Sequence, residues 1–247
     1  MAKRLEALRS ERSSWDAEWR EVSEYIAPTR GRFTVGEKSR SRASRRKKII
    51  NSRATQALRT LSAGMASNIV TPTRPWFRMG TEDPALAENG AVRVWLEALE
   101  KLLSRIFAKS GLYQTIPSIY SELGAFGTAA LSQDEDFETV CRFTPHAVGE
   151  YFIANDERGQ ARTFYRELQM TVDQVVRRFS LPRCSQTVRN LYDIGNYDAW
   201  VTVGQGIERN DDRFASLGLP RDRTYVGVYW EKGGTTDLLL ERKGYFE

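Results

Sequence analysis

The start of the chain has the apolar spacing of an amphipathic helix. Large apolar side chains recur at intervals of three and four residues, and Arg12 is the single polar member of this stripe. Pro28 cannot continue a helix and marks its end. Trp15 and Trp19 also lie on the stripe and are bulky for a narrow coiled-coil seam. The pattern therefore predicts an N-terminal helix over residues 1–29 that docks by a broad face.

A second helix is predicted from an N-cap at Asn51 or Ser52 to the residues before Pro72. Its small residues allow another backbone to approach closely. Its inward face is expected to contain Ala54, Ala57, Leu58, Leu61 and Met65.

This second helix leads into a corner, LSAGMASNIVTPTRPWF at residues 61–77. Pro72 and Pro75 end the helix and fix an extended segment that presents Trp76 and Phe77 to an apolar surface. Two interpretations of the corner are open at this point. It is either a helix end with aromatic packing inside one subunit, or a fixed corner in a larger assembly.

Two more helices are predicted before the pattern changes. One covers residues 90–109, is stopped by a Ser-Gly pair, and has a broad apolar face that is expected to be core. The next helix is expected to begin at about Thr115, because Pro117 is tolerated near a first turn, and to reach Ala125. The apolar face of the first contains Val92, Trp95, Leu96, Leu99, Leu102, Leu103 and Ile106.

The later part of the chain has the period-two pattern of strands. Tyr151 and Ile153 alternate before a turn-rich NDERG, and Thr171 with Gln174 forms a capping-box signature for a short helix. Helices first and strands afterwards predict an α+β fold, with helices over 50–130 and mainly strands and short helices over 138–247. The predicted ranges are a returning strand at 161–168, short helices ending at 179 and covering 186–194, a strand at 199–207, and a hairpin of 225–231 with 236–242.

The net charge of +5 is concentrated in one segment. Residues 30–48 contain a single acid, Glu37, and are predicted to form a flexible basic loop. One interpretation is a salt-dependent contact with nucleic-acid phosphates that ignores base sequence. The other is a loop that orders against an acidic neighbouring subunit. The candidate contact residues are Arg40, Arg42, Arg45, Arg46, Lys47 and Lys48.

Residues with catalytic potential are sparse. There is no phosphate-binding Gly-x-x-x-x-Gly-Lys motif, and His146 is the single histidine. Cys141 and Cys184 lack metal-ligand spacing, and Gly204 with Gly206 has no dinucleotide-binding context. We therefore predict no catalytic residue, no cofactor and no metal. No apolar run is long enough to span a membrane and no secretory signal is visible, so we expect a cytosolic chain with no membrane partner.

Two other function classes have sequence features of their own. Asp222, Glu241 and Lys243 resemble the Asp, Glu-x-Lys arrangement with which some nucleases hold a divalent cation. The basic loop alone could instead serve a non-specific DNA-binding module, although no helix-turn-helix, zinc-finger or basic-zipper pattern accompanies it.

The order of motifs resembles one known family across nearly the whole chain. The matching pieces are WDAEWREVSEYIAP (15–28), LSAGM (61–65), TPTRPWF (71–77), LYQTIPSIYSELGAFGTAAL (112–131) and VGEYFIANDERGQARTFYRELQMTVDQVVRRF (148–179). Together they are similar to the head-to-tail connecting proteins, or portal proteins, of short-tailed, T7-like phages. This resemblance implies a structural subunit of a ring, a dodecamer when full length, through which double-stranded DNA enters and leaves the capsid.

The resemblance also implies partners and a location. Terminase, capsid and tail proteins would meet the ring, which lies at a capsid vertex of the virion after assembly in the host cytoplasm. A closed ring needs two different faces on each subunit. Trp15 with Trp19, and Trp76 with Phe77, are the candidate subunit-packing residues.

Members of the family are considerably longer than this chain. The resemblance covers their N-terminal half, and we expect the stem, clip and crown of a portal to be absent. The predicted division is an N-terminal helix at 1–29, the basic loop at 30–48 and a portal-wing-like α+β domain at 49–247. We accordingly expect the chain alone not to form a working channel.

Overall fold

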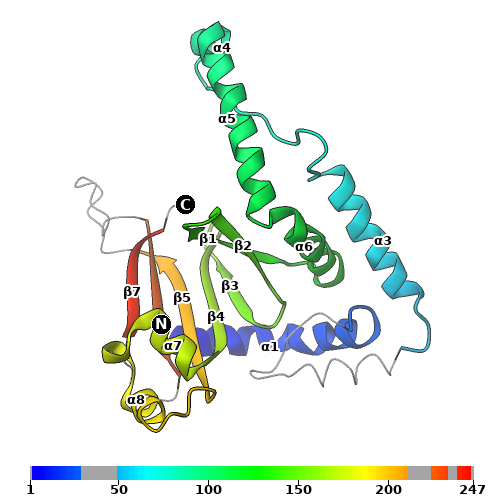
Figure 1. Ribbon diagram of the computed structural model, residues 1–247. Coiled ribbons are helices and arrows are strands. Elements are labelled where there is room, and N and C mark those ends of the chain that lie inside the picture. Colours follow the sequence, from blue (N-terminus) through cyan, green and yellow to red (C-terminus); the bar gives the residue numbers. More distant parts are fainter. Residues whose placement is uncertain (1, 29–48, 211–223, 233–237, 246–247) are drawn as a thin grey trace. The chain divides into compact units, whose positions relative to one another are not determined.

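The computed structural model describes residues 2–28, 49–210, 224–232 and 238–245 (Figure 1). The basic segment with its six candidate residues and Asp222 lie outside these described residues. The described chain divides into two compact units. The first contains residues 2–18 and those from Gly149 onward, and the second contains residues 19–28 and 49–148.

The first unit is built on a five-stranded antiparallel meander in which each strand pairs with the next in the chain. Side chains alternate between its two faces, so each face can form a separate core. Strands and both hairpins fall where the period-two pattern predicts them. Their bounds are β3 Tyr151–Asn155, β4 Ala161–Thr171, β5 Trp200–Arg209, β6 Tyr225–Glu231 and β7 Leu238–Tyr245.

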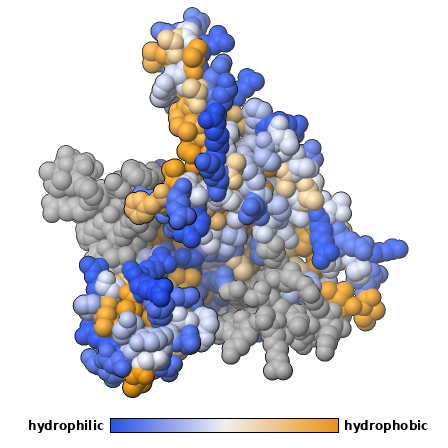
Figure 2. Space-filling model, viewed as in Figure 1, coloured by the Kyte–Doolittle hydropathy of each residue, from blue (hydrophilic) through white to orange (hydrophobic). Residues whose placement is uncertain are grey.

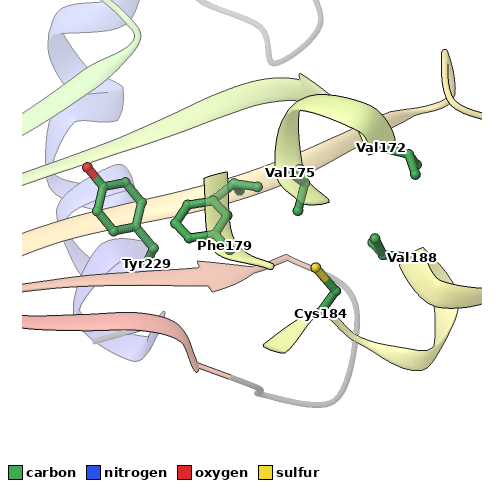
Figure 3. Close-up of a cluster of buried hydrophobic side chains, with 7 residues drawn as sticks. Val172, Val175, Phe179, Cys184, Val188 and Tyr229 are labelled. Carbon is green, nitrogen blue, oxygen red and sulfur yellow. The ribbon is translucent and has the colours of Figure 1, made fainter. Parts of the chain in front are cut away.

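One face of the sheet is covered by two short helices, α7 (Val172–Phe179) and α8 (Gln186–Asp193), joined through a 3-10 turn at Leu181–Arg183. The predicted capping box is confirmed, because Thr171 and Gln174 bond reciprocally at the start of α7. Figure 3 shows side chains of both helices gathered with Tyr229 of β6. The buried members of this first core are Val172, Val175, Phe179, Cys184, Val188, Val203 and Tyr229.

The opposite face is covered by the first part of α1 (Ala2–Tyr25), which ends where Pro28 predicts. Leu5 and Leu8 are 3% and 4% exposed and pack on the sheet. Burying them is worth roughly 2 kcal/mol per side chain. The sheet contributes Phe152, Tyr165, Val228 and Trp230 to this second core.

Glycine is required where the strands pass under the aromatic rings of this second core. A Cβ at Gly204 would lie 2.3 Å from Trp230, and one at Gly206 would lie 2.6 Å from Tyr165. Both glycines are paired directly with these aromatic residues across the sheet. The two glycines of the Gly-Gln-Gly motif therefore make room for the aromatic rings that pack over the sheet.

Arg12, the polar member of the N-terminal stripe, anchors α1 to the sheet. Its Nη1 donates to the carbonyl oxygens of Gly149 (3.1 Å) and Tyr151 (2.8 Å), and its guanidinium lies 3.8 Å from the ring centroid of Phe152. Burial lowers the pKa of Arg12, while the ion pair with Asp16 at 3.0 Å opposes that shift. The arginine thus satisfies backbone carbonyls that an apolar residue would leave unpaired.

The second unit contains longer helices and a separate two-stranded sheet. The bounds of α5 are those that the sequence predicts, and Ser110 caps its end. The start of α6 at Thr115 was wrong, because the buried Leu112 and the left-handed Gly111 begin the helix earlier and Pro117 lies inside it. The elements are α3 Arg53–Asn68, α4 Pro84–Glu88, α5 Gly90–Lys109, α6 Leu112–Phe126, β1 Ala130–Asp136 and β2 Val140–His146.

α3 packs against α6 through fewer residues than predicted. Leu58 and Ser62 are buried, whereas the predicted inward residues Ala54, Ala57 and Leu61 are exposed. The close approach depends on Gly124 of α6, where an added Cβ would lie 3.1 Å from Leu61 and 3.3 Å from Leu58. No described helix is both long and apolar enough to cross a membrane.

Candidate subunit-packing groove

A groove of about 760 Å³ lies inside the second unit, between the extended corner at residues 72–79 and α5. One side of α5 forms its wall, because the lining positions recur with helical spacing from Arg93 to Ala108. Tyr113 at the start of α6 completes it.

The corner is held at both ends. Arg74 Nη2 donates to the carbonyl oxygen of Asn68 at 2.7 Å, which satisfies an acceptor at the end of α3. The backbone N–H of Met79 donates to Glu100 Oε1 on α5, also at 2.7 Å. These bonds and the two prolines keep the corner extended, so a ligand in the groove would meet a prearranged surface.

The aromatic pair of the corner packs into its own unit and also reaches the surface. The rings of Trp76 and Phe77 lie 6.0 and 5.7 Å from Phe107 of α5, which in turn lies 6.1 Å from Phe143 of β2. Trp76 Nε1 donates to Tyr113 Oη at 3.1 Å. Trp76 nevertheless remains 36% exposed and lines the groove. Both interpretations of the corner thus have a counterpart in the structure.

The groove is predominantly basic. Five cationic side chains line it against two carboxylates, Glu97 and Glu100. Several positive groups around a concave surface focus the potential and favour an acidic partner. The cationic residues are Arg74, Arg78, Arg93, Lys101 and Arg105.

The side of α5 away from the groove is apolar and only partly covered. Trp95 is 63% exposed and Leu102 is 51% exposed. Figure 2 shows the corresponding hydrophobic surface along this helix. The other five residues of the predicted face are half-buried and no described residue of α5 is fully buried, so the prediction that this face is core holds only in part. The exposed part of the face would gain free energy if another surface covered it.

Comparison with known proteins shows the family to which the chain belongs. The model of the family described as "Bacteriophage head to tail connecting protein" matches residues 1–247. The chain belongs to this head-to-tail connecting protein family. It is 43% identical over 238 residues to a "Probable portal protein" of Bordetella phage BPP-1, and 37% identical over 247 residues to a "Portal protein" of Salmonella phage epsilon15. These matches cover 96% and 100% of the chain but 43% and 44% of the relatives, so the chain spans less than half their length.

The resemblance drawn from motif order is therefore confirmed, and the metal-dependent nuclease finds no support in the family or its relatives. Glu241 and Lys243 lie in β7, opposite Val228 and Val226 of β6. Among the residues that the structure describes, no group of three or more His, Cys, Asp or Glu side chains is arranged to hold a metal.

The other candidate packing residues lie on α1. Trp15 is 57% exposed, whereas Trp19 is half-buried. Trp15 belongs to the first unit and Trp19 to the second. Trp15 therefore presents an aromatic surface to solvent, whereas other residues of the same chain cover part of Trp19.

Sequence reasoning missed one surface of this connector chain. The β1–β2 hairpin ends in Asp134, Glu135, Asp136, Phe137 and Glu138, and Phe137 is fully exposed at 109%. Four carboxylates within five residues were the available signal. They carry no apolar alternation, so the period-two pattern did not detect the strand.

Proposed function

We propose that this chain forms the wing-like part of a phage portal subunit. The observation that carries the proposal is the family match over residues 1–247. Two portal relatives, which the chain matches over at least 96% of its length, agree with it. In this proposal the whole protein forms a homo-oligomeric ring, a dodecamer, at one capsid vertex. DNA passes through the ring during packaging and ejection.

The exposed surfaces of the second unit support a role in assembly. A ring requires heterologous contacts, in which one face of a subunit meets a different face of its neighbour. The groove beside Trp76 and Phe77 supplies one face of defined shape and charge. The Trp95 side of α5 adds exposed apolar surface to this unit, and Trp15 adds such surface to the first unit; both would gain free energy when covered.

The partners and location follow from the same proposal. Terminase docks on the ring during packaging and tail proteins take its place in the virion, while assembly proceeds in the host cytoplasm. The basic segment at 30–48, between the N-terminal helix at 1–29 and the wing domain at 49–247, contacts DNA phosphates without reading sequence. The role is structural, and the chain performs no catalytic step.

A chimera tests the proposal directly. This chain replaces the matched region of the Bordetella phage relative, and the chimera and its parent are purified side by side. We expect closed rings of the same rotational symmetry in electron micrographs of both. Monomeric chimera beside a ring-forming parent, with the chimera folded by circular dichroism, contradicts the proposal.

A further inference from the structure

The tip of the β1–β2 hairpin is an exposed acidic and aromatic projection. Phe137 has a fully exposed side chain, and Val140, on the other side of the turn, is 65% exposed. A large aromatic side chain with no cover is costly in water, since burying it is worth roughly 2–3 kcal/mol. Four carboxylates, at residues 134, 135, 136 and 138, lie close to it in the sequence.

Local bonds hold this tip in one shape. Asp136 Oδ1 accepts the backbone N–H of Glu138 at 2.9 Å, and Arg142 lies 3.4 Å from its Oδ2. These contacts lower the pKa of Asp136, with the backbone bond as the first cause. Thr139 Oγ1 donates to the carbonyl oxygen of Cys141 at 2.8 Å. A tip that is already ordered loses little conformational entropy when it binds.

The groove is complementary to this tip in charge and in chemistry. Five cations against two carboxylates line the groove, and four carboxylates of the tip lie close to Phe137 in the sequence. The groove also presents the exposed part of Trp76, which suits an aromatic partner, because aromatic pairs gain about 0.5–1.5 kcal/mol beyond area burial. The two surfaces belong to different elements of the same unit.

We propose that the hairpin tip of one copy of this chain, residues 134–138, inserts into the groove beside Trp76 of a second copy. Phe137 packs against Trp76, and the tip carboxylates face Arg93 and Arg105. The inference rests on the proposed function, since it names the occupant of the groove in the ring.

The geometry of this contact agrees with a ring. Tip and groove are different surfaces, so in a ring each copy donates a tip to one neighbour and receives a tip from the other, which is the heterologous kind of contact that a ring requires. DNA fits the groove less well. A DNA backbone would leave the apolar part of the groove unused, whereas Phe137 of the tip would cover it.

Cross-linking between two variants that each carry one introduced cysteine tests the contact. Both native cysteines are buried, at 6% and 1% exposure, so introduced thiols react selectively. Glu135→Cys chains, which keep Phe137, are mixed with Ala108→Cys chains, whose new thiol lies in the groove, and treated with a short bismaleimide. We expect a dimer of twice the 28.2 kDa chain mass. Ala98→Cys is the matched control, since it is exposed on the same helix outside the groove.

Charge reversal adds a second arm. Glu138→Lys in the first partner should reduce the cross-linked product about fivefold, and Arg105→Glu in the second should restore it. Equal product with Ala98→Cys, or absence of product while mass photometry shows multimers, overturns the inference. Loss of DNA binding in the Arg105→Glu chain, without any cross-link, assigns the groove to DNA and also overturns it. Closed rings of the chimera with no tip–groove cross-link would leave the proposed function intact.

Discussion

The two units of the chain differ in how much apolar surface they cover. In the first unit, two clusters of buried side chains fill both faces of the five-stranded sheet. The second unit buries fewer apolar side chains, leaves Trp95, Leu102 and Phe137 exposed, and has no buried residue on α5. The second unit therefore keeps more apolar surface available for contact than the first.

This contrast separates stability from assembly within one chain. Substitutions in the first unit are expected to change the free energy of unfolding, because the side chains there are already covered. Substitutions on the second unit's surface are expected to change association and leave folding nearly unaffected. Matched substitutions in the two units test that separation.

The largest expected effect comes from a pair of phenylalanines. Phe179→Ala empties a position that is 3% exposed beside Tyr229, whose ring lies 5.3 Å away. We expect a loss of about 3–5 kcal/mol in the free energy of unfolding, measured by urea denaturation. Phe137→Ala, in the fully exposed tip, should stay within about 0.5 kcal/mol of the parent. Similar losses in the free energy of unfolding for the two variants would contradict the proposed difference between the two units.

Two arginines provide the next test. Arg12→Met removes bonds to the carbonyl oxygens of Gly149 and Tyr151 and leaves them without that donor. We expect a loss of about 1.5–3 kcal/mol, seen as faster hydrogen exchange in strand β3. Arg59→Met, at an exposed position of α3 outside the groove, is the control and should leave exchange in its own unit unchanged. Protection that survives Arg12→Met would show that α1 is held by its leucines alone.

A pair of glycines should give effects of opposite sign. Gly204→Ala forces a Cβ to within 2.3 Å of Trp230, so we expect thermal unfolding to shift down by the equivalent of about 1–3 kcal/mol. Gly64→Ala lies within α3 with no atom within 4 Å of the new Cβ, and should stabilise its unit by about 0.5–1 kcal/mol. Stabilisation by Gly204→Ala would mean that Trp230 does not lie over the strand.

The smallest expected effect concerns Cys184. Burial raises the pKa of its thiol, and the Glu231 carboxylate adds to the shift. The unfolded chain therefore loses this proton first as pH rises, so stability should decline slightly above the ordinary thiol pKa and be unaffected below it. Iodoacetamide should alkylate native Cys184 at least about tenfold more slowly than the introduced thiol of Phe137→Cys at pH 8. Equal rates would contradict the burial of this core.

The sequence predicted the positions of helices and strands better than the burial of their side chains. Period and capping located α5, the capping box at Thr171 and the strands of the meander, because those signals are local. Periodicity identified an apolar face on α5 but does not say what covers it, and Trp95 and Leu102 of that face are exposed. The corner at Trp76 was found from its prolines, yet the opposing groove wall depends on tertiary packing.

Other misses have equally physical causes. The requirement for Gly124 arises only where α3 crosses α6, and the requirement for Gly204 only where Trp230 lies over β5. α6 begins at Leu112 because burial there outweighs the cost of Pro117 within the helix. The family was predicted from the order of motifs, which no single element would have established.

Hydrogen exchange at two protein concentrations tests the central claim, that the second unit is the assembly surface. The account predicts that protection of residues 72–109 and 134–138 rises with concentration, while strands β3 to β6 exchange at a constant rate. The Phe137→Ala chain should lose that concentration dependence and retain the protection of its sheet. A rise confined to the first unit, or unchanged exchange in the second unit while multimers form, would contradict the account.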